Sequence, residues 1–237
     1  MHGFNRDDTD AKEEFNRIQK SLIHNNYRIP LVGFSWDSKV LWEIAKNNTK
    51  QNGENLTKFI MSFENKCPNT DIRILAHSLG AAVVNSTLVS LYKNDTWTSK
   101  IASIHLLGAA INNSLIAQDT LLGNAIIDTV DKFYNLYNHE DDGLKVNQLE
   151  NPQPLGLVGA PNVNIPSNYI DTNVTYEILP FSDADGDGNI EECFEDINPV
   201  KVWGDNHCGY IGFKNSTTGS IIDDGAMNIV VRDWIKS

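Results

Sequence analysis

Cysteine and basic residues are both scarce in this chain. Its 3 cysteines in 237 residues, Cys67, Cys193 and Cys208, form neither a C-x-x-C pair nor a dense framework. An odd cysteine must therefore stay free or pair with another chain, which leaves the redox compartment open. The 19 basic residues face 31 acidic ones, and the net charge of -12 disfavours nucleic acid and anionic lipid as partners.

Long apolar runs and targeting signals are also missing. No stretch approaches the roughly 20 apolar residues that a transmembrane helix needs. The N-terminal sequence MHGFNRDDTD lacks the basic and apolar regions of a secretory signal. We therefore expect a soluble chain with no membrane span and no signal peptide. An extracellular location stays open for the case that a further segment precedes Met1.

The length and hydrophobic content of the chain are typical of one compact α/β domain. A chain of this length with 41% hydrophobic residues can bury one sizeable core, and no internal repeat or linker divides residues 1–237. Short apolar runs, typical of buried strands, alternate with segments of helical periodicity. The expected strands are 29–36, 71–77, 101–109, 132–138 and 174–179. This alternation predicts a mostly parallel central sheet with helices on both faces.

Several finer expectations follow from turn and cap chemistry. Asp10, with Glu13 three residues later, has the pattern of a capping box that starts the first helix. The helical tract 40–63 contains Asn52-Gly53, which should break it in two. Residues 144–167 lose all periodicity, contain four prolines and predict a long functional loop. The apolar cluster within 116–127 is interpreted as core packing, with a lid as the alternative.

The chemistry centres on Ala76-His77-Ser78-Leu79-Gly80. This motif lies between an expected buried strand and an expected helix, the context of a nucleophile elbow. Small residues around the serine allow a tight turn that exposes its hydroxyl, and the following helix N-terminus offers free N–H groups to an oxyanion. The Leu79 N–H is then the natural first donor. The alternative is that Ser78 merely caps the helix.

On these residues the chain resembles the α/β-hydrolase superfamily of esterases and lipases over nearly its whole length. Ala76 departs from the glycine that is commoner in that motif. The resemblance implies a triad in the chain order serine, acid, histidine. It implies His207 as the base, because His207 lies in the glycine-bracketed loop Gly204-Asp205-Asn206-His207-Cys208-Gly209 and is the histidine that follows the acid loop.

The acid is expected in the loop that begins at Asn138. Asp141 and Asp142 compete for the role, and the family's spacing favours Asp141 slightly. Its carboxylate would hold the imidazole in the required tautomer. His2-Gly3-Phe4 resembles the family's oxyanion loop, which implies the Phe4 N–H as the second donor. That loop normally follows an apolar strand, and only Met1 precedes it here, so we expect the fold to lack the usual N-terminal strands.

A second constellation predicts a metal. The segment from Asp183 to Glu191 places oxygen-bearing side chains at alternate positions and a glycine at the sixth, like the first part of an EF-hand loop. The match fails at the twelfth position, Phe194, so we expect a lone structural Ca²⁺ loop inserted at about 182–196. A flexible acidic turn is the alternative. The candidate ligands are Asp183, Asp185, Asp187, Asn189 and Glu191.

Together these patterns predict a serine hydrolase that cleaves carboxylic esters, with a small-molecule or lipid ester as substrate and no organic cofactor. Thioester or amide hydrolysis by the same triad is the first alternative, because fold-level analogy does not distinguish these reactions. A calcium-stabilised binding module that has lost the chemistry is the second. The acyl and alcohol specificity and the oligomeric state are not predicted.

Overall fold

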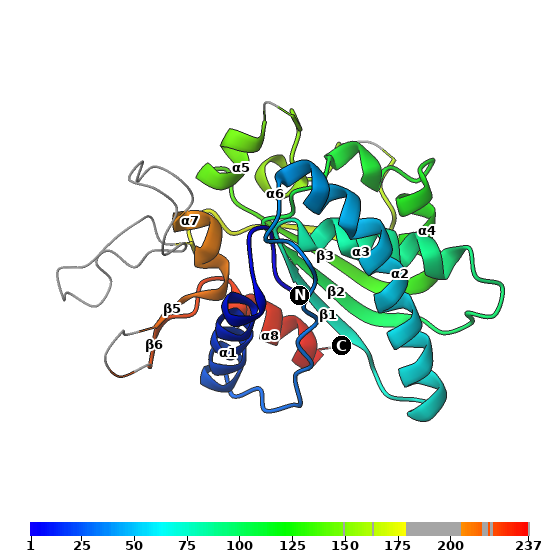
Figure 1. Ribbon diagram of the computed structural model, residues 1–237, viewed down its shortest axis with the longest axis horizontal. Helices are drawn as coiled ribbons and strands as arrows, with labels where there is room; N and C mark the ends of the chain where they lie inside the picture. The colour runs from blue at the N-terminus through cyan, green and yellow to red at the C-terminus, as the bar shows by residue number, and fades with distance from the viewer. Residues whose placement is uncertain (149, 163, 179–204, 215–217, 219, 237) are drawn as a thin grey trace.

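A parallel β-sheet forms the centre of the molecule (Figure 1). The computed structural model describes residues 1–148, 150–162, 164–178, 205–214, 218 and 220–236. Among these, four strands are ordered β1-β2-β3-β4, and each neighbouring pair is parallel. The strands are β1 (Arg73–His77), β2 (Ile101–Leu107), β3 (Val130–Tyr137) and β4 (Tyr169–Asn173). The predicted fold class is confirmed.

Helices cover both faces of this sheet (Figure 1). One face carries α2 (Trp42–Lys66), α3 (Gly80–Tyr92) and α4 (Leu121–Thr129), and the other carries α1 (Asp8–His24) and α8 (Met227–Lys236). The strands β1, β2 and β3 therefore contribute apolar residues to both cores, which is the pattern of a buried parallel sheet.

Alternation along the strands assigns each side chain to one of the two cores. In β1, Ile74 and Ala76 pack into the core beneath α2 and α3, whereas Leu75 packs with Ile18 and Leu22 of α1. Because β1 contributes side chains to both cores, packing on both faces of the sheet fixes the turn that follows it.

Shorter elements follow the strands and the long loops. They are η1 (Asn113–Ile116), α5 (Asp142–Asn147), α6 (Leu155–Val158), α7 (Asp205–Cys208), η2 (Gly209–Ile211), β5 (Phe213–Lys214) and β6 (Ile221–Asp223). The expected loop at 144–167 thus contains α6 and the end of α5. In α4, Leu122 and Ile126 belong to the core, while Leu121 is 53% exposed. Within the described ranges, no helix is both long and apolar enough to span a bilayer.

The prediction of a strand at 29–36 is wrong. These residues form no strand, and Val32 is 66% exposed. Met1 lies beside the end of β1 instead, with its amino group donating to Leu75 O (2.8 Å) and its carbonyl accepting from His77 N–H (3.1 Å). Trp36 directs its backbone N–H to His2 Nε2 (3.0 Å) rather than to a strand. A short apolar run alone does not reveal which backbone partner it will find.

Two helix predictions also need correction. The first helix starts one turn earlier than expected, because Asp7 is the N-cap and forms the capping box with Asp10. The predicted break at Gly53 does not occur, since α2 is continuous. A Cβ on Gly53 would lie 2.3 Å from Ser86 Cβ in α3, so this glycine permits close helix packing and does not form a turn.

The last predicted strand is displaced along the chain. Residues 174–179 were expected to be extended, whereas β4 is Tyr169–Asn173 and the described residues after it form a turn. Val174 N–H donates to Tyr137 O (2.9 Å), and Val174 O then accepts from Ile178 N–H (3.1 Å). The ladder with β3 therefore ends at Val174, although the residues beyond it have strand-like composition.

Stability should fall on mild acidification because of buried histidines. Burial lowers the pKa of His105 below 6.5, against the opposing effect of Asp233, and burial also lowers the pKa values of His2 and His77. The unfolded chain then binds more protons than the folded one below about pH 6.5, so stability is lost as pH falls toward each folded pKa. Each histidine contributes at most about 1.4 kcal/mol per pH unit. Urea unfolding between pH 7.5 and 5.5 tests this.

The variant His105→Gln gives that experiment its control. His105 accepts from the Trp234 indole N–H through Nδ1 (3.2 Å) and faces Asp233 with Nε2 (3.4 Å), so glutamine keeps polarity without the titration. Its acid-induced loss of stability should be smaller than that of the wild type. A free energy of unfolding that is constant from pH 7.5 to 5.5 in the wild type would contradict the expectation.

Candidate active site

Ser78 occupies the sharp turn between β1 and α3. Its φ of 55° lies in the left-handed region, which non-glycine residues rarely adopt and which is typical of a strained nucleophile turn. Backbone hydrogen bonds hold this conformation. Ser78 N–H donates to Leu107 O (2.9 Å), and Ser78 O accepts from the N–H groups of Ala81 (3.1 Å) and Ala110 (3.2 Å). The hydroxyl is therefore presented by a backbone fixed to β2 and α3.

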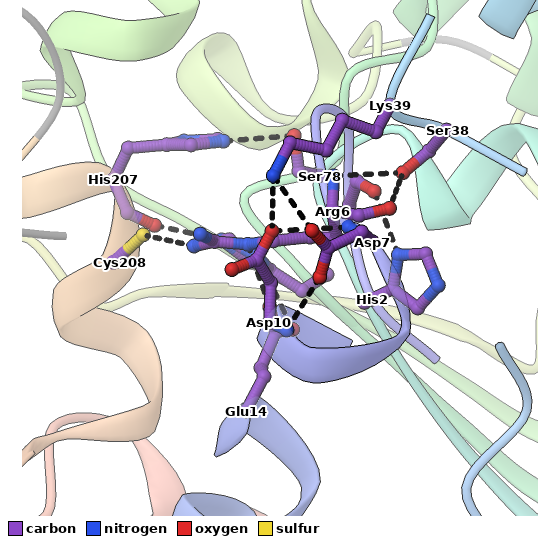
Figure 2. A network of polar contacts seen from close by, with 12 residues as sticks. His2, Arg6, Asp7, Asp10, Glu14, Ser38, Lys39, Ser78, His207 and Cys208 are labelled. Carbon is purple, nitrogen blue, oxygen red and sulfur yellow. Dashed lines mark hydrogen bonds and ion pairs between the residues drawn. The ribbon is translucent and has the colours of Figure 1, made fainter. Parts of the chain in front are cut away.

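His207 and Asp141 complete a hydrogen-bonded row with this serine. His207 Nε2 lies 2.8 Å from Ser78 Oγ. A dashed line in Figure 2 marks this contact between the two labelled side chains. His207 Nδ1 lies 2.9 Å from Asp141 Oδ1 and 2.8 Å from Oδ2. Asp141 is fully buried, and His207 and Ser78 are 6% and 8% exposed. Since a carboxylate only accepts, Nδ1 carries the proton and Nε2 is left to accept from the hydroxyl.

The two competing aspartates have different environments. Asp141 is the N-cap of α5 and accepts from Leu144 N–H through Oδ1 (2.9 Å), which orients its carboxylate toward His207. Asp142 has a side chain that is 56% exposed, and its carboxylate lies 3.4 Å from Lys145 Nζ. Only Asp141 of this pair contacts the imidazole in the structure.

Three further polar residues organise this row, and none of them was predicted from the sequence to have a role in it. Tyr210 donates its hydroxyl to Asp141 Oδ2 (3.1 Å), and its burial, together with Asp141, raises its pKa well above the usual value. Asn206 accepts from Asp142 N–H (2.9 Å) and donates to Glu140 O, so it joins the segment that carries His207 to the residues on both sides of Asp141. His77 contacts the backbone of His207. Tyr210 and Asn206 lie within three residues of His207, which is the signal that would have suggested them.

The His2-Gly3-Phe4 loop lies directly against the serine. A Cβ on Gly3 would be 2.7 Å from Ser78 Cβ, so only glycine fits there. His2 fixes the loop: its Nε2 accepts from Trp36 N–H (3.0 Å), its ring stacks on the Trp36 indole, and Nδ1 lies 2.9 Å from Gly3 O. Burial lowers the pKa of His2, which favours the neutral ring that this arrangement requires.

Two backbone donors flank Ser78 without acceptors in the described part of the chain. The N–H of Leu79 follows the serine, and the N–H of Phe4 follows Gly3; neither donates to a described residue. Phe4 itself is held by an edge-on contact with Trp42, with ring centroids 4.9 Å apart. These are the two N–H groups that the sequence motifs predicted for an oxyanion hole.

The expected metal ligands Asp183, Asp185, Asp187, Asn189 and Glu191 lie outside the described residues. Within the described ranges, no group of three or more histidine, cysteine, aspartate or glutamate side chains is arranged to hold a metal ion. Cys67 is exposed and free, whereas Cys208, next to His207, is disulfide-bonded.

Comparison with known proteins assigns the family. No curated protein matches the chain. A family model described as "Alpha/beta hydrolase of unknown function (DUF900)" matches residues 1–158, a segment that contains the Gly3 loop, Ser78 and Asp141. The fold around these residues is a parallel sheet with helices on both faces, as that description requires. The chain belongs to this family of α/β hydrolases.

Proposed function

We propose that this protein is a serine hydrolase that cleaves carboxylic esters through an acyl-enzyme, with Ser78 as nucleophile, His207 as general base and Asp141 as the acid. The observation that carries the proposal is the unbroken row from Ser78 Oγ through the imidazole to the buried Asp141 carboxylate, with contacts of 2.8 to 2.9 Å. Such a row activates an otherwise weak hydroxyl nucleophile.

In the proposed mechanism, Ser78 Oγ attacks the acyl carbonyl while His207 Nε2 takes its proton. The oxygen of the tetrahedral intermediate becomes negative and is stabilised by the N–H groups of Leu79 and Phe4. Collapse of the intermediate expels the alcohol, which receives the proton from His207. Water then attacks the acyl-enzyme with His207 again acting as base, which releases the carboxylic acid and restores Ser78.

Each supporting residue has a physical role in this scheme. The Asp141 carboxylate holds the imidazole in the tautomer with Nδ1–H and stabilises the positive charge that forms during attack. Tyr210 and the Leu144 N–H fix the carboxylate itself. The strained φ of Ser78 keeps its hydroxyl clear of the backbone.

The test compares matched substrates that differ in the bond to be cleaved. p-Nitrophenyl butyrate, a butyryl thioester and a butyryl anilide are assayed with the same protein preparation. We expect the ester to be hydrolysed with the highest kcat/KM. A clear preference for the thioester or the anilide would reassign the reaction to that class, while absence of turnover on all three would favour a binding module that has lost the chemistry.

We further propose that Ca²⁺ binds the segment from Asp183 to Glu191, on the support of its alternating carboxylates. Calcium should raise the melting temperature by several degrees and chelation should lower it, because binding to the native state contributes about 2.7 kcal/mol at a hundredfold excess over Kd. Magnesium should substitute poorly, since it prefers a tighter octahedral shell. Calorimetry of metal-free protein provides the measurement.

The double variant Asp185→Ala, Asp187→Ala is the control for this prediction. It should lose the calcium response and keep ester hydrolysis in the temperature range where it is folded. If calcium leaves the melting temperature of the metal-free wild type unchanged, the segment is an acidic turn that does not bind calcium.

A further inference from the structure

His77, the residue before the nucleophile, links the nucleophile turn to the backbone of the base. Its Nε2 lies 2.7 Å from the carbonyl oxygen of His207, and both residues are buried. A carbonyl oxygen only accepts, so Nε2 carries the hydrogen and donates. The two imidazole rings lie side by side, with centroids 4.8 Å apart and planes inclined by 39°. The proposed nucleophile and base are therefore connected twice, once through side chains and once through His77.

The other edge of the His77 ring faces a buried ion pair. Nδ1 lies 3.7 Å from Glu14 Oε1 and has no hydrogen-bond partner in the described part of the chain. Glu14 Oε2 lies 3.3 Å from Arg6 Nε, and Arg6 reaches on to Cys208 Sγ (3.6 Å), beside His207 (Figure 2). Arg6 pairs with Glu14, and the buried Arg17 also interacts electrostatically with it, so positive charge compensates the carboxylate that faces this side of the His77 ring.

The charged and titratable groups around His77 keep its ring neutral. Burial is the main cause of its strongly lowered pKa, followed by the neighbouring His207, with Arg6 acting in the same direction. The hydrogen bond to the His207 backbone opposes this lowering of the pKa, as does Asp141 to a smaller extent, and Glu14 adds the nearby carboxylate described above. A neutral ring with hydrogen on Nε2 is the form that donates to the His207 carbonyl without placing a second positive charge beside the imidazolium that catalysis produces.

The segment that carries His207 needs such a contact. His207 lies on α7, a helix of only four residues, whose own hydrogen bonds are too few to fix it. The Asn206 side chain ties this segment to the acid loop, and His77 ties it to β1. A displacement of about 1 Å at a reacting group can cost on the order of 100-fold in rate.

We propose that His77 is a positioning residue for His207. The Nε2–H of His77 holds the backbone carbonyl of His207 and so sets the distance between the His207 imidazole and Ser78. This inference rests on the proposed function and adds a role for a residue that touches neither substrate nor the reacting atoms. It predicts that kcat depends on the hydrogen bond from the side chain of residue 77 to the His207 carbonyl, and not on the imidazole ring itself.

Three variants separate the hydrogen bond from the imidazole. Glutamine places an amide N–H at about the reach of Nε2, leucine fills similar volume without a donor, and asparagine keeps the amide but is too short to reach the carbonyl. With p-nitrophenyl butyrate, His77→Leu and His77→Asn should lower kcat about 10- to 100-fold and leave KM within about twofold. His77→Gln should restore kcat to within about threefold of the wild type.

A measurement without turnover distinguishes failure of this inference from failure of the proposed function. In the wild type, the proton between His207 Nδ1 and Asp141 should give a downfield NMR resonance, identified by its absence in His207→Gln. It should persist in His77→Gln and broaden or vanish in His77→Leu and His77→Asn. Circular dichroism and urea unfolding establish that each variant is folded, and the asparagine variant replaces the leucine variant if leucine prevents folding.

Rescue by glutamine with loss in leucine or asparagine supports the positioning role. Equal kcat and equal resonances in all folded variants, or a glutamine variant as impaired as the asparagine variant, would overturn it. A wild type that shows the resonance without hydrolysing any ester would overturn the proposed function and leave the NMR comparison to decide the role of His77.

Discussion

Replacing Ser78 with alanine is expected to lower the kcat/KM for p-nitrophenyl butyrate by a factor on the order of 10³ to 10⁶. The substitution removes the one oxygen that the proposed mechanism uses as nucleophile, which lies 2.8 Å from His207 Nε2. Residual turnover would come from the oxyanion donors and from substrate binding alone. The change deletes a single atom, so the fold should persist. Steady-state kinetics together with circular dichroism measure both effects.

Ser103 offers a matched control for this variant. It is a buried serine on β2, and its hydroxyl has no hydrogen-bond partner in the described part of the chain. Ser103→Ala removes the same atom from the same sheet at a distance from the proposed site, so its kcat/KM should stay within about twofold of the wild type. Wild-type turnover in folded Ser78→Ala would show that Ser78 is not the nucleophile, and the proposed function would fall with it.

The second large effect is expected for Asp141→Asn, which should lower kcat by a factor on the order of 10² to 10⁴ near pH 7. Asparagine has nearly the shape of aspartate, but its amide favours the imidazole tautomer in which Nε2 carries the hydrogen and is unable to take a proton from Ser78. It also removes the charge that stabilises the imidazolium. The effect should appear in kcat, since substrate does not contact this buried residue.

Asp142→Asn is the matched variant, one residue along the same loop. Its carboxylate is mostly exposed and pairs with Lys145, a surface ion pair of small energetic value, so kcat should stay within about twofold of the wild type. Equal losses in the two variants, or a greater loss in Asp142→Asn, would reassign the acid while leaving Ser78 and His207 in their proposed roles.

The parallel sheet was predictable because its strands are short apolar runs, buried on both faces, and separated by helical segments. β1, β2 and β3 lie within two residues of their expected starts. The run at 29–36 is also short and apolar, yet Met1 lies beside β1 and the Trp36 N–H donates to His2. Which backbone partner an apolar run obtains is decided by tertiary structure, and composition does not report it.

Gly53 and Asp7 illustrate the same limit at helices. A glycine within a helical pattern indicates either a break or a close approach, and only the neighbouring Ser86 decides between them. Asp7 and Asp10 both precede apolar periodicity, and the structure uses Asp7 as cap with Asp10 completing the box. Local patterns thus identified α1 and α2, left the first turn of α1 ambiguous and suggested a break in α2 that is absent.

At the candidate site, sequence motifs named the residues that carry recognisable chemistry, and tertiary contacts supply the others. Ser78 lies in a motif whose strand and helix context is local, so it stood out. His77, Asn206 and Tyr210 form the contacts described here with partners 64 to 130 residues away in the chain. No spacing rule links such positions, and their roles become visible only when the loops are brought together.

Covalent labelling by a fluorophosphonate shows directly whether Ser78 is an activated nucleophile, because only an activated serine reacts with this reagent. We predict one adduct per chain by intact-protein mass spectrometry, located on Ser78 by peptide mapping. It should be absent in Ser78→Ala and form far more slowly in Asp141→Asn than in Asp142→Asn. Folded wild-type protein that remains unlabelled, or an adduct on another residue that persists in Ser78→Ala, would contradict this prediction.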